Sequence, residues 1–190
     1  MKLTNIFEIS WDAPITPYQS MAGIPLGASA SVLETILCNY LIDGNDKLYK
    51  FKNSPTLHLA IKKMDDHGDG GYQFRLADEE TLHKNLNETP ALTIEIKSNK
   101  VFTVTTYNFS FPDDIASESI YKGALPGGIK LGSLVSDLIP LTRLEFDDIE
   151  ECFYTDKNYG EVEITGWCVP LEDEPNQIIT EICVIPNKAQ

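Results

Sequence analysis

Hydrophobic positions recur along the chain with a helical period in one short stretch and with the period of strands in most others. Residues 32–40 carry the helical period, which predicts one short helix. Ser31 and Glu34 form a capping-box pattern at its start, in which the serine hydroxyl accepts an early amide and the glutamate reaches back. Residues 43–46, Asp-Gly-Asn-Asp, predict the turn that ends this part of the chain.

Strand-like runs of apolar residues cover much of the remaining sequence. Turn residues separate them, as at 66–71 and 98–100, which predicts antiparallel hairpins. Two further short helices are predicted at residues 78–87 and 133–139, and Pro140 ends the second. The predicted strands are residues 6–11, 47–52, 57–64, 72–76, 92–97, 101–109, 152–155, 161–169 and 177–185.

Two segments of the chain have similar sequences, and similar elements are predicted after each of them. Residues 23–33 and 128–138 are identical at six of eleven positions and lie 105 residues apart. A helix and at least three antiparallel strands are predicted after each copy. The pattern therefore predicts an α+β fold made of a duplicated unit, a short helix followed by an antiparallel β-meander. The predicted boundaries are 1–112 for the first repeat with its N-terminal strand, 113–127 for a polar linker and 128–190 for the second repeat.

The net charge of the chain limits the classes of molecule that it is expected to bind. The 190 residues include 29 Asp and Glu against 15 Lys and Arg, which gives a net charge of −14. Nucleic acids and anionic membranes are poor partners for such a surface, because contacts with phosphate require lysine and arginine. A hydrophobic content of 42% is enough for a folded core. The charge is compatible with a basic protein partner, although solubility alone also explains it.

Motifs for catalysis or nucleotide binding are missing from the sequence. There is no GxSxG nucleophile elbow, no GxxxxGK[ST] loop and no GxGxxG loop, and only three histidines occur. Glu161 and Glu163 alternate with Val162 and Ile164, which is typical of the outward face of a strand and not of an acid/base pair. These observations predict a protein that is not an enzyme and uses no cofactor.

The best candidate for a metal site is the loop that holds Asp65, His67 and Asp69. A calcium loop of the EF-hand type requires a bidentate glutamate at its twelfth position, which is Leu76 in this chain, and requires flanking helices. Strands are predicted on both sides instead. We therefore interpret the loop as an acidic hairpin tip and expect no metal site.

The N-terminus and the cysteines predict a cytoplasmic protein with reduced thiols. Glu8, Trp11 and Asp12 interrupt the apolar run that a secretory signal needs, and no apolar stretch reaches about 18 residues. The four cysteines include no CxxC pair, and lone cysteines in strands are typically small buried hydrophobic residues. A cross-strand disulfide between Cys168 and Cys183 remains an alternative.

Acidic residues concentrate in the second half of the chain. Residues 116–190 carry 14 acidic and 5 basic side chains, a net charge of −9, against −5 for residues 1–115. One interpretation is a solvated acidic loop whose aromatic residues point inward. The other is an interface in which carboxylates attract a basic partner and aromatic residues anchor it. The candidate binding residues are Glu145, Asp147, Asp148, Glu150, Glu151, Tyr154, Asp156, Glu172, Asp173 and Glu174.

The paired segments Gly23–Leu33 and Gly128–Leu138, each opening a short helix and a meander, resemble the two-repeat organisation of bacterial toxin-immunity proteins. The pyocin-immunity-like group, whose members are small, acidic and cytosolic, is the nearest pattern. The unit is also similar to those of the β-lactamase-inhibitor protein and of outer-membrane assembly lipoproteins, which are exported. The resemblance implies an inhibitor that neutralises a cognate toxin, such as a basic nuclease used in contact-dependent inhibition, through the ten residues above.

Two other classes of function remain open at this stage. An acidic adaptor or assembly protein without catalytic activity would have the same repeat fold. A small hydrolase would need a pocket lined by histidines or carboxylates, for which the sequence offers no constellation.

Overall fold

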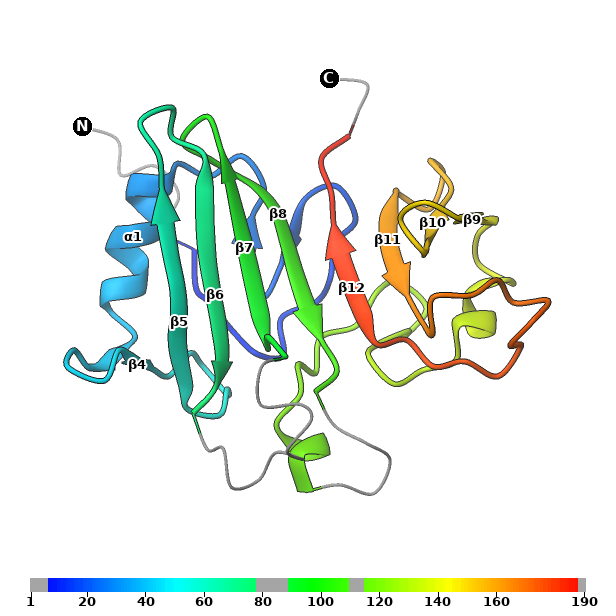
Figure 1. Cartoon of the computed structure of the whole chain (residues 1–190), viewed down its shortest axis with the longest axis horizontal. Coiled ribbons are helices and arrows are strands. Elements are labelled where there is room, and N and C mark those ends of the chain that lie inside the picture. The colour runs from blue at the N-terminus through cyan, green and yellow to red at the C-terminus, as the bar shows by residue number, and fades with distance from the viewer. Residues whose placement is uncertain (1–6, 78–88, 110–114, 188–190) are drawn as a thin grey trace.

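One antiparallel sheet of ten strands dominates the computed structural model, which describes residues 7–77, 89–109 and 115–187 (Figure 1). The order of strands is β3-β4-β5-β6-β7-β8-β12-β11-β10-β9. The strands are β3 (Leu41–Asp43), β4 (Leu48–Tyr49), β5 (Leu57–Met64), β6 (Gly70–Leu76), β7 (Leu92–Lys97), β8 (Lys100–Tyr107), β9 (Leu144–Asp147), β10 (Cys152–Thr155), β11 (Val162–Thr165) and β12 (Glu181–Val184).

The remaining elements are short and lie outside this sheet. A two-stranded pair, β1 (Ser20–Met21) and β2 (Ile24–Pro25), precedes helix α1 (Ala30–Cys38). Two 3-10 helices, η2 (Ile115–Glu118) and η3 (Val135–Leu138), follow the first group of strands. The predicted α+β class is confirmed, and β5, β7 and β10 have the predicted bounds. The helix predicted at 78–87 lies outside the described residues.

Several local predictions are wrong. The strands predicted at 47–52, 161–169 and 177–185 are shorter, as β4, β11 and β12, and the helix predicted at 133–139 is only the 3-10 helix η3. Strands β3 and β9 were not predicted.

The N-terminal strand predicted at residues 6–11 is a single parallel bridge between Ser10 and Lys52, and residues 7–9 are irregular. The predicted capping box does not form. Helix α1 begins at Ala30, before Ser31, and its N-cap residue is Ser29, whose side chain makes no capping hydrogen bond to the helix. Ser31 instead shares a hydrogen bond with Ser29, and Glu34 forms an ion pair with Lys62 of β5.

The two faces of the sheet differ in chemistry. We define the core face by one row of paired positions that runs from β6 to β9 and carries mainly large apolar side chains, which pack beneath the N-terminal segment and α1. Because strand residues alternate between faces, the neighbouring row points the other way. The core-face row is Phe74, Leu92, Thr106, Ile182, Ile164, Phe153 and Phe146.

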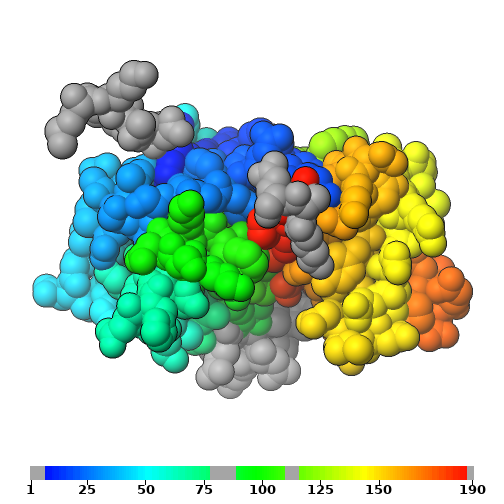
Figure 2. Space-filling model, turned by 90° about the horizontal axis from the view of Figure 1, so that it is seen from above, coloured from blue at the N-terminus to red at the C-terminus, as the bar shows by residue number. Residues whose placement is uncertain are grey.

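Strands β8 and β12 join the two groups of strands. They pair antiparallel over four residues each, with Thr105 opposite Cys183. Figure 2 shows β12 (red) between the green first group and the orange second group, with the blue N-terminal segment along one side of all three. The sheet is therefore continuous across the middle of the chain.

The end of the predicted linker packs into the core. Tyr121 is buried, and its hydroxyl accepts the amide of Ala22 and donates to the carbonyl of Ala13. The indole of Trp11 donates to the carbonyl of Ser119 at 2.9 Å. The described part of this segment is thus tied to the N-terminal residues, while the division into two repeats and a linker stays a prediction.

Two glycines at matching positions of the similar segments 23–33 and 128–138 provide a test of local packing. Gly23 and Gly128 both have a left-handed backbone, with φ of 76° and 82°. A methyl group on Gly23 would collide with the carbonyl oxygen of Glu8, whereas one on Gly128 would meet open space. We expect G128A to lower the free energy of unfolding by about 1–2 kcal/mol, the cost of the left-handed conformation alone. We expect G23A to lower it by at least twice as much in chemical denaturation, and equal losses would contradict the packing described here.

Candidate functional site

The face of the sheet opposite the core carries polar side chains, and we call it the open face. Its central row has the same strand register as the core row but is shifted by one residue along each strand. Hydroxyl, thiol, amide and carboxylate groups fill it. The residues of the row are Gln73, Thr93, Thr105, Cys183, Glu163, Tyr154 and Glu145.

A cleft of about 350 Å³ lies on the open face where the two groups of strands meet. Three glutamates from three different strands line it, Glu95 of β7, Glu163 of β11 and Glu181 of β12. The cleft therefore exists only because β8 and β12 are paired. Its other lining residues are Phe102, Thr103, Thr105, Tyr107, Cys183, Ile185 and Pro186.

A β-bulge places Phe102 in this cleft. The register of β7 and β8 shifts, so that Glu95 pairs with Thr103 but the next residue, Ile96, pairs with Val101. Phe102 is the extra residue of β8 at this point. Bulges redirect side chains and are frequent beside functional sites. Phe102 thereby joins Thr103 among the residues that line the cleft.

The three glutamates differ in their hydrogen bonds. Glu95 accepts from the hydroxyl of Thr103 at 3.0 Å, and Glu163 accepts from the hydroxyl of Tyr154 at 3.2 Å. The carboxylate of Glu181 has no hydrogen bond or ion pair with any residue that the structure describes. Burial, with a smaller contribution from the charge of Glu163, raises the pKa of Glu181 to about 7. Glu181 is therefore half-ionised near neutral pH.

The neighbouring titratable groups of the cleft remain neutral. Burial raises the pKa of Tyr107 to about 12, and burial also raises the pKa of the Cys183 thiol above its usual value. Both effects are due mainly to desolvation, which disfavours the charged form. Negative charge in the cleft thus comes from the glutamates.

The predicted acidic cluster includes one compact, exposed group, the turn between β9 and β10. We call Asp148–Glu151 the acidic turn. Its three carboxylates, on Asp148, Glu150 and Glu151, surround Ile149, whose side chain is 88% exposed. Asp147, just before the turn, accepts the amides of Ile149 and Glu150 at 2.8 and 3.1 Å and so holds its shape.

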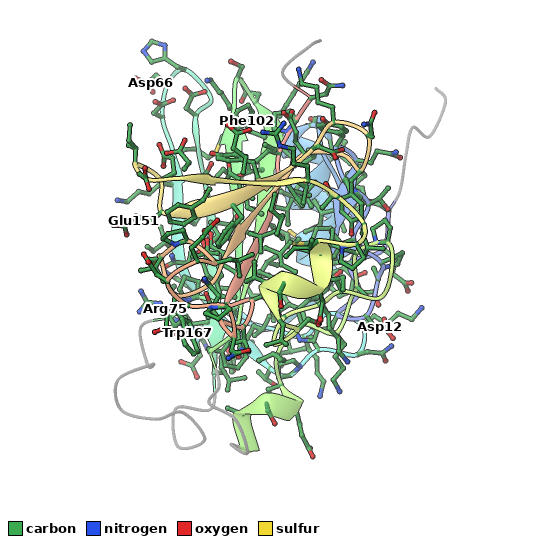
Figure 3. All side chains as sticks on the ribbon, turned by 90° about the vertical axis from the view of Figure 1, so that its right-hand side faces the viewer. Asp12, Asp66, Arg75, Phe102, Glu151 and Trp167 are labelled. Atoms are coloured by element: carbon green, nitrogen blue, oxygen red, sulfur yellow. The ribbon has the colours of Figure 1, made fainter. Side chains whose placement is uncertain are left out.

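A second exposed apolar side chain belongs to the same side of the molecule. Trp167 is 49% exposed and follows β11. In Figure 3, Glu151 and Trp167 lie on one side of the ribbon, as does Arg75, whereas Asp12 lies on the opposite side. The pKa of Cys168, next to Trp167, is raised by burial and then by the charge of Glu151, which places the acidic turn near this loop.

The other predicted binding residues are dispersed. Asp156 follows the opposite end of β10 from the acidic turn and accepts the backbone amides of Arg143, Asn158 and Tyr159, which lowers its pKa. Residues 172–174 are exposed in the loop between β11 and β12. The ten predicted residues therefore do not form one continuous group.

Two of the predicted binding residues, Tyr154 and Glu145, lie at one end of the central row of the open face. Tyr154 is half-buried between its strand partners Glu145 and Glu163. The sequence prediction missed the three glutamates of the cleft, because they are far apart in the chain and Glu163 was interpreted as an outward strand residue. Glu181 could have been noticed from the sequence, because it is the one charged residue in the run Ile178–Ile185, in which Thr180 is the one other polar residue besides the cysteine.

Among the described residues, no three histidine, cysteine, aspartate or glutamate side chains form a group that could hold a metal ion. The four cysteines are free. Within the same ranges, no helix is both long and apolar enough to cross a bilayer. A comparison with protein-family models finds no family that matches the chain, and comparisons with curated proteins and with solved structures find no match either.

The raised pKa of Glu181 predicts how stability changes with pH. The folded chain binds this proton more tightly than the unfolded chain, whose glutamate has a pKa near 4.5, so the free energy of unfolding falls as pH rises from about 4.5 to about 7. We expect E181Q to remove this fall and to stabilise the protein by up to about 3 kcal/mol above pH 7. Urea denaturation from pH 4.5 to 8 measures the difference.

The control is E34Q, the same change at an exposed site on α1. This variant should keep the dependence on pH of the wild-type chain, because the ion pair that it breaks is exposed. If the free energy of unfolding of E181Q falls with pH as steeply as that of the wild-type chain, the titrating group is not Glu181.

Proposed function

We propose that the chain is an immunity protein that binds a cognate basic toxin, of the nuclease type, and neutralises it in the cytoplasm. The observation that carries this proposal is the acidic turn, in which carboxylates surround the exposed side chain of Ile149. Such a surface combines long-range attraction for a basic partner with an apolar contact that only a partner can bury.

One exposed side chain of the acidic turn favours an interface. The phenylalanines of this stretch lie inward, as the solvated-loop alternative expects: Phe153 is buried, and Phe146 packs against it. The support for an interface is Ile149, whose side chain points outward. Trp167 offers a second apolar anchor, and tryptophan is enriched among the residues that contribute most to binding. Carboxylates around such anchors attract a basic surface and keep the free protein soluble.

The proposal includes a duplicated fold, and matching backbone hydrogen bonds support it. In each half, three bonds connect the loop before the helix to the residues around the start of the last strand, at the start of β8 in the first half and just before β12 in the second. The corresponding loop residues are 105 apart and their corresponding partners are 78 apart. The bonds join Gly27–Val101, Ala28–Val101 and Ala30–Asn99 in the first half, and Gly132–Ile179, Ser133–Ile179 and Val135–Gln177 in the second.

The register at the centre of the sheet agrees with the same duplication. Thr105 pairs with Cys183, which is also 78 residues away, so an approximate two-fold axis at this pair would exchange the halves. Strands β5–β8 would then correspond to β9–β12 (Figure 1). The pairs that flank the axis, and exchange under it, are Val104–Val184 and Thr106–Ile182. A two-repeat organisation is what the resemblance to immunity proteins implies.

A role without catalysis is part of the proposal. The thiols of Cys152 and Cys183 are buried, and burial raises the pKa of both, so they are protonated at neutral pH and poor nucleophiles. An acidic adaptor protein remains the alternative with the same fold.

Coexpression tests the function directly. The protein encoded beside this gene is expressed alone, then with the chain, and then with a chain whose acidic turn is reversed in charge. We expect toxicity alone, survival with the native chain and a stable one-to-one complex. A neighbour that is not toxic, or toxicity that the native chain does not relieve, would contradict immunity and favour the adaptor.

Charge reversal of the acidic turn should slow association with this toxin. We expect D148K/E150K/E151K to reduce the association rate constant by one or more orders of magnitude at low salt, because the local field that attracts a basic surface is inverted. Stopped-flow or surface-plasmon measurements at two salt concentrations give the rate. Asp147 is left unchanged because it holds the turn.

The matched control reverses three exposed acids elsewhere, at Asp46, Asp66 and Glu118. It makes the same change in net charge, so it should slow association far less than the triple variant of the turn. Equal slowing by both variants would show that net charge, and not the acidic turn, attracts the toxin.

A further inference from the structure

The cleft of the open face is suited to a cation larger than a metal ion. Glu95, Glu163 and Glu181 line one space of about 350 Å³, yet among the described residues no three such groups have the geometry of a metal site. A space of this volume is large enough for an extended cation whose donors reach more than one of the carboxylates. The cationic side chains of proteins, lysine and arginine, have this reach.

The acids of the cleft have unused capacity for hydrogen bonds. An ionised carboxylate has about four acceptor sites. Glu95 and Glu163 each accept one hydroxyl from the protein, and Glu181 accepts none from the described residues. A half-buried carboxylate without a donor is costly, because burial removes water without replacing its hydrogen bonds. A donor-rich cation would supply the missing partners.

The remaining walls favour arginine over lysine. A guanidinium group is planar, carries five N–H donors and stacks on aromatic rings, whereas an ammonium group is a compact and strongly hydrated charge. Ile185 and Pro186 offer apolar surface for the methylene groups, and the glutamates offer acceptors from different strands. The ring of Phe102 already accepts a cation on one face, since the Nζ of Lys97 lies 5.0 Å from its centroid.

We propose that this cleft receives an arginine side chain of the partner protein, with Glu181, Glu163 and Glu95 around its guanidinium group. The inference rests on the proposed function, since it names a contact made with the basic toxin. It adds a second contact area, on the sheet itself, to the acidic turn. The charge is complementary, because three acids line the cleft against one neighbouring base, Lys97, whose Nζ lies over the ring of Phe102.

Binding of the arginine is coupled to release of a proton from Glu181. The titratable groups that face Glu181 are Glu163 on β11, Tyr107 on β8, Cys183 on β12 and Cys168 in the loop after β11. Burial raises the pKa of the tyrosine and of both thiols, so these groups do not become charged between pH 6 and 8. Affinity should therefore rise with pH across this range, by up to about tenfold per pH unit below the pKa of Glu181.

The test uses N-acetylarginine methylamide as the probe and the full chain as the receptor, at about 150 mM salt. Amide chemical shifts in NMR spectra locate the binding site, and a dissociation constant on the order of 1 mM is expected for so small a ligand. We expect the shifts to concentrate in β8, β11 and β12. The citrulline analogue, which has nearly the same shape without the charge, should bind at least about tenfold more weakly.

Two variants and one control connect the binding to the named residues. E181Q and E163Q should each lower the affinity for the probe by about tenfold, because each variant removes one charged hydrogen-bond acceptor. E181Q should also remove the dependence on pH between 6 and 8. E34Q on α1 loses the same charge outside the cleft and should bind the probe as the native chain does.

Three results would overturn the proposal: shifts spread evenly over all acidic surfaces, equal binding of the citrulline analogue, or unchanged binding by both cleft variants. The proposed function can fail separately. Probe binding in the cleft together with no protection from the neighbouring toxin would contradict immunity but leave the arginine site. Protection by a chain whose cleft does not bind the probe would overturn the arginine site alone.

Discussion

The pairing of β8 with β12 is the interaction on which the rest of this structure depends. It joins two groups of strands into a ten-stranded sheet and places Thr105 opposite Cys183 at the centre. The same register brings Thr106 and Ile182 together on the core face. Because neighbouring residues of a strand point to opposite faces, one set of backbone contacts determines both the continuity of the core and the composition of the cleft.

The open face combines features that are unfavourable for an isolated protein. Glu181 loses water without gaining a hydrogen bond from the described residues, and the side chains of Ile149 and Trp167 are exposed. Each would become favourable if a basic protein with apolar anchors covered this side of the molecule. Sites that reduce stability in the free protein are frequently sites of function, which is why a single proposed partner accounts for both the cleft and the acidic turn.

Several elements could be predicted because their causes are local. The alternation in Leu57–Met64 and Leu92–Lys97 and the intervening turns were sufficient for the hairpins. The beginning of α1 was predicted incorrectly, since Ser31 and Glu34 fit a capping box but find other partners, Ser29 and Lys62. The N-terminal strand was wrong because its apolar residues are buried by packing and not by a ladder of hydrogen bonds.

The sequence by itself determined the α+β class, the strands with strong alternation and the concentration of acids at residues 145–151, because periodicity, turn residues and charge act over a few neighbouring positions. The turn that presents these acids was not predicted. Only the tertiary structure decided which acids lie together. Glu95 and Glu181 are 86 residues apart and share a cleft, whereas Asp156 and Glu151 are five residues apart and lie at opposite ends of one strand. Hydrophobic alternation and turns set the register within each hairpin, but the pairing of β8 with β12 joins strands that are far apart in the chain, and no short stretch of sequence specifies it.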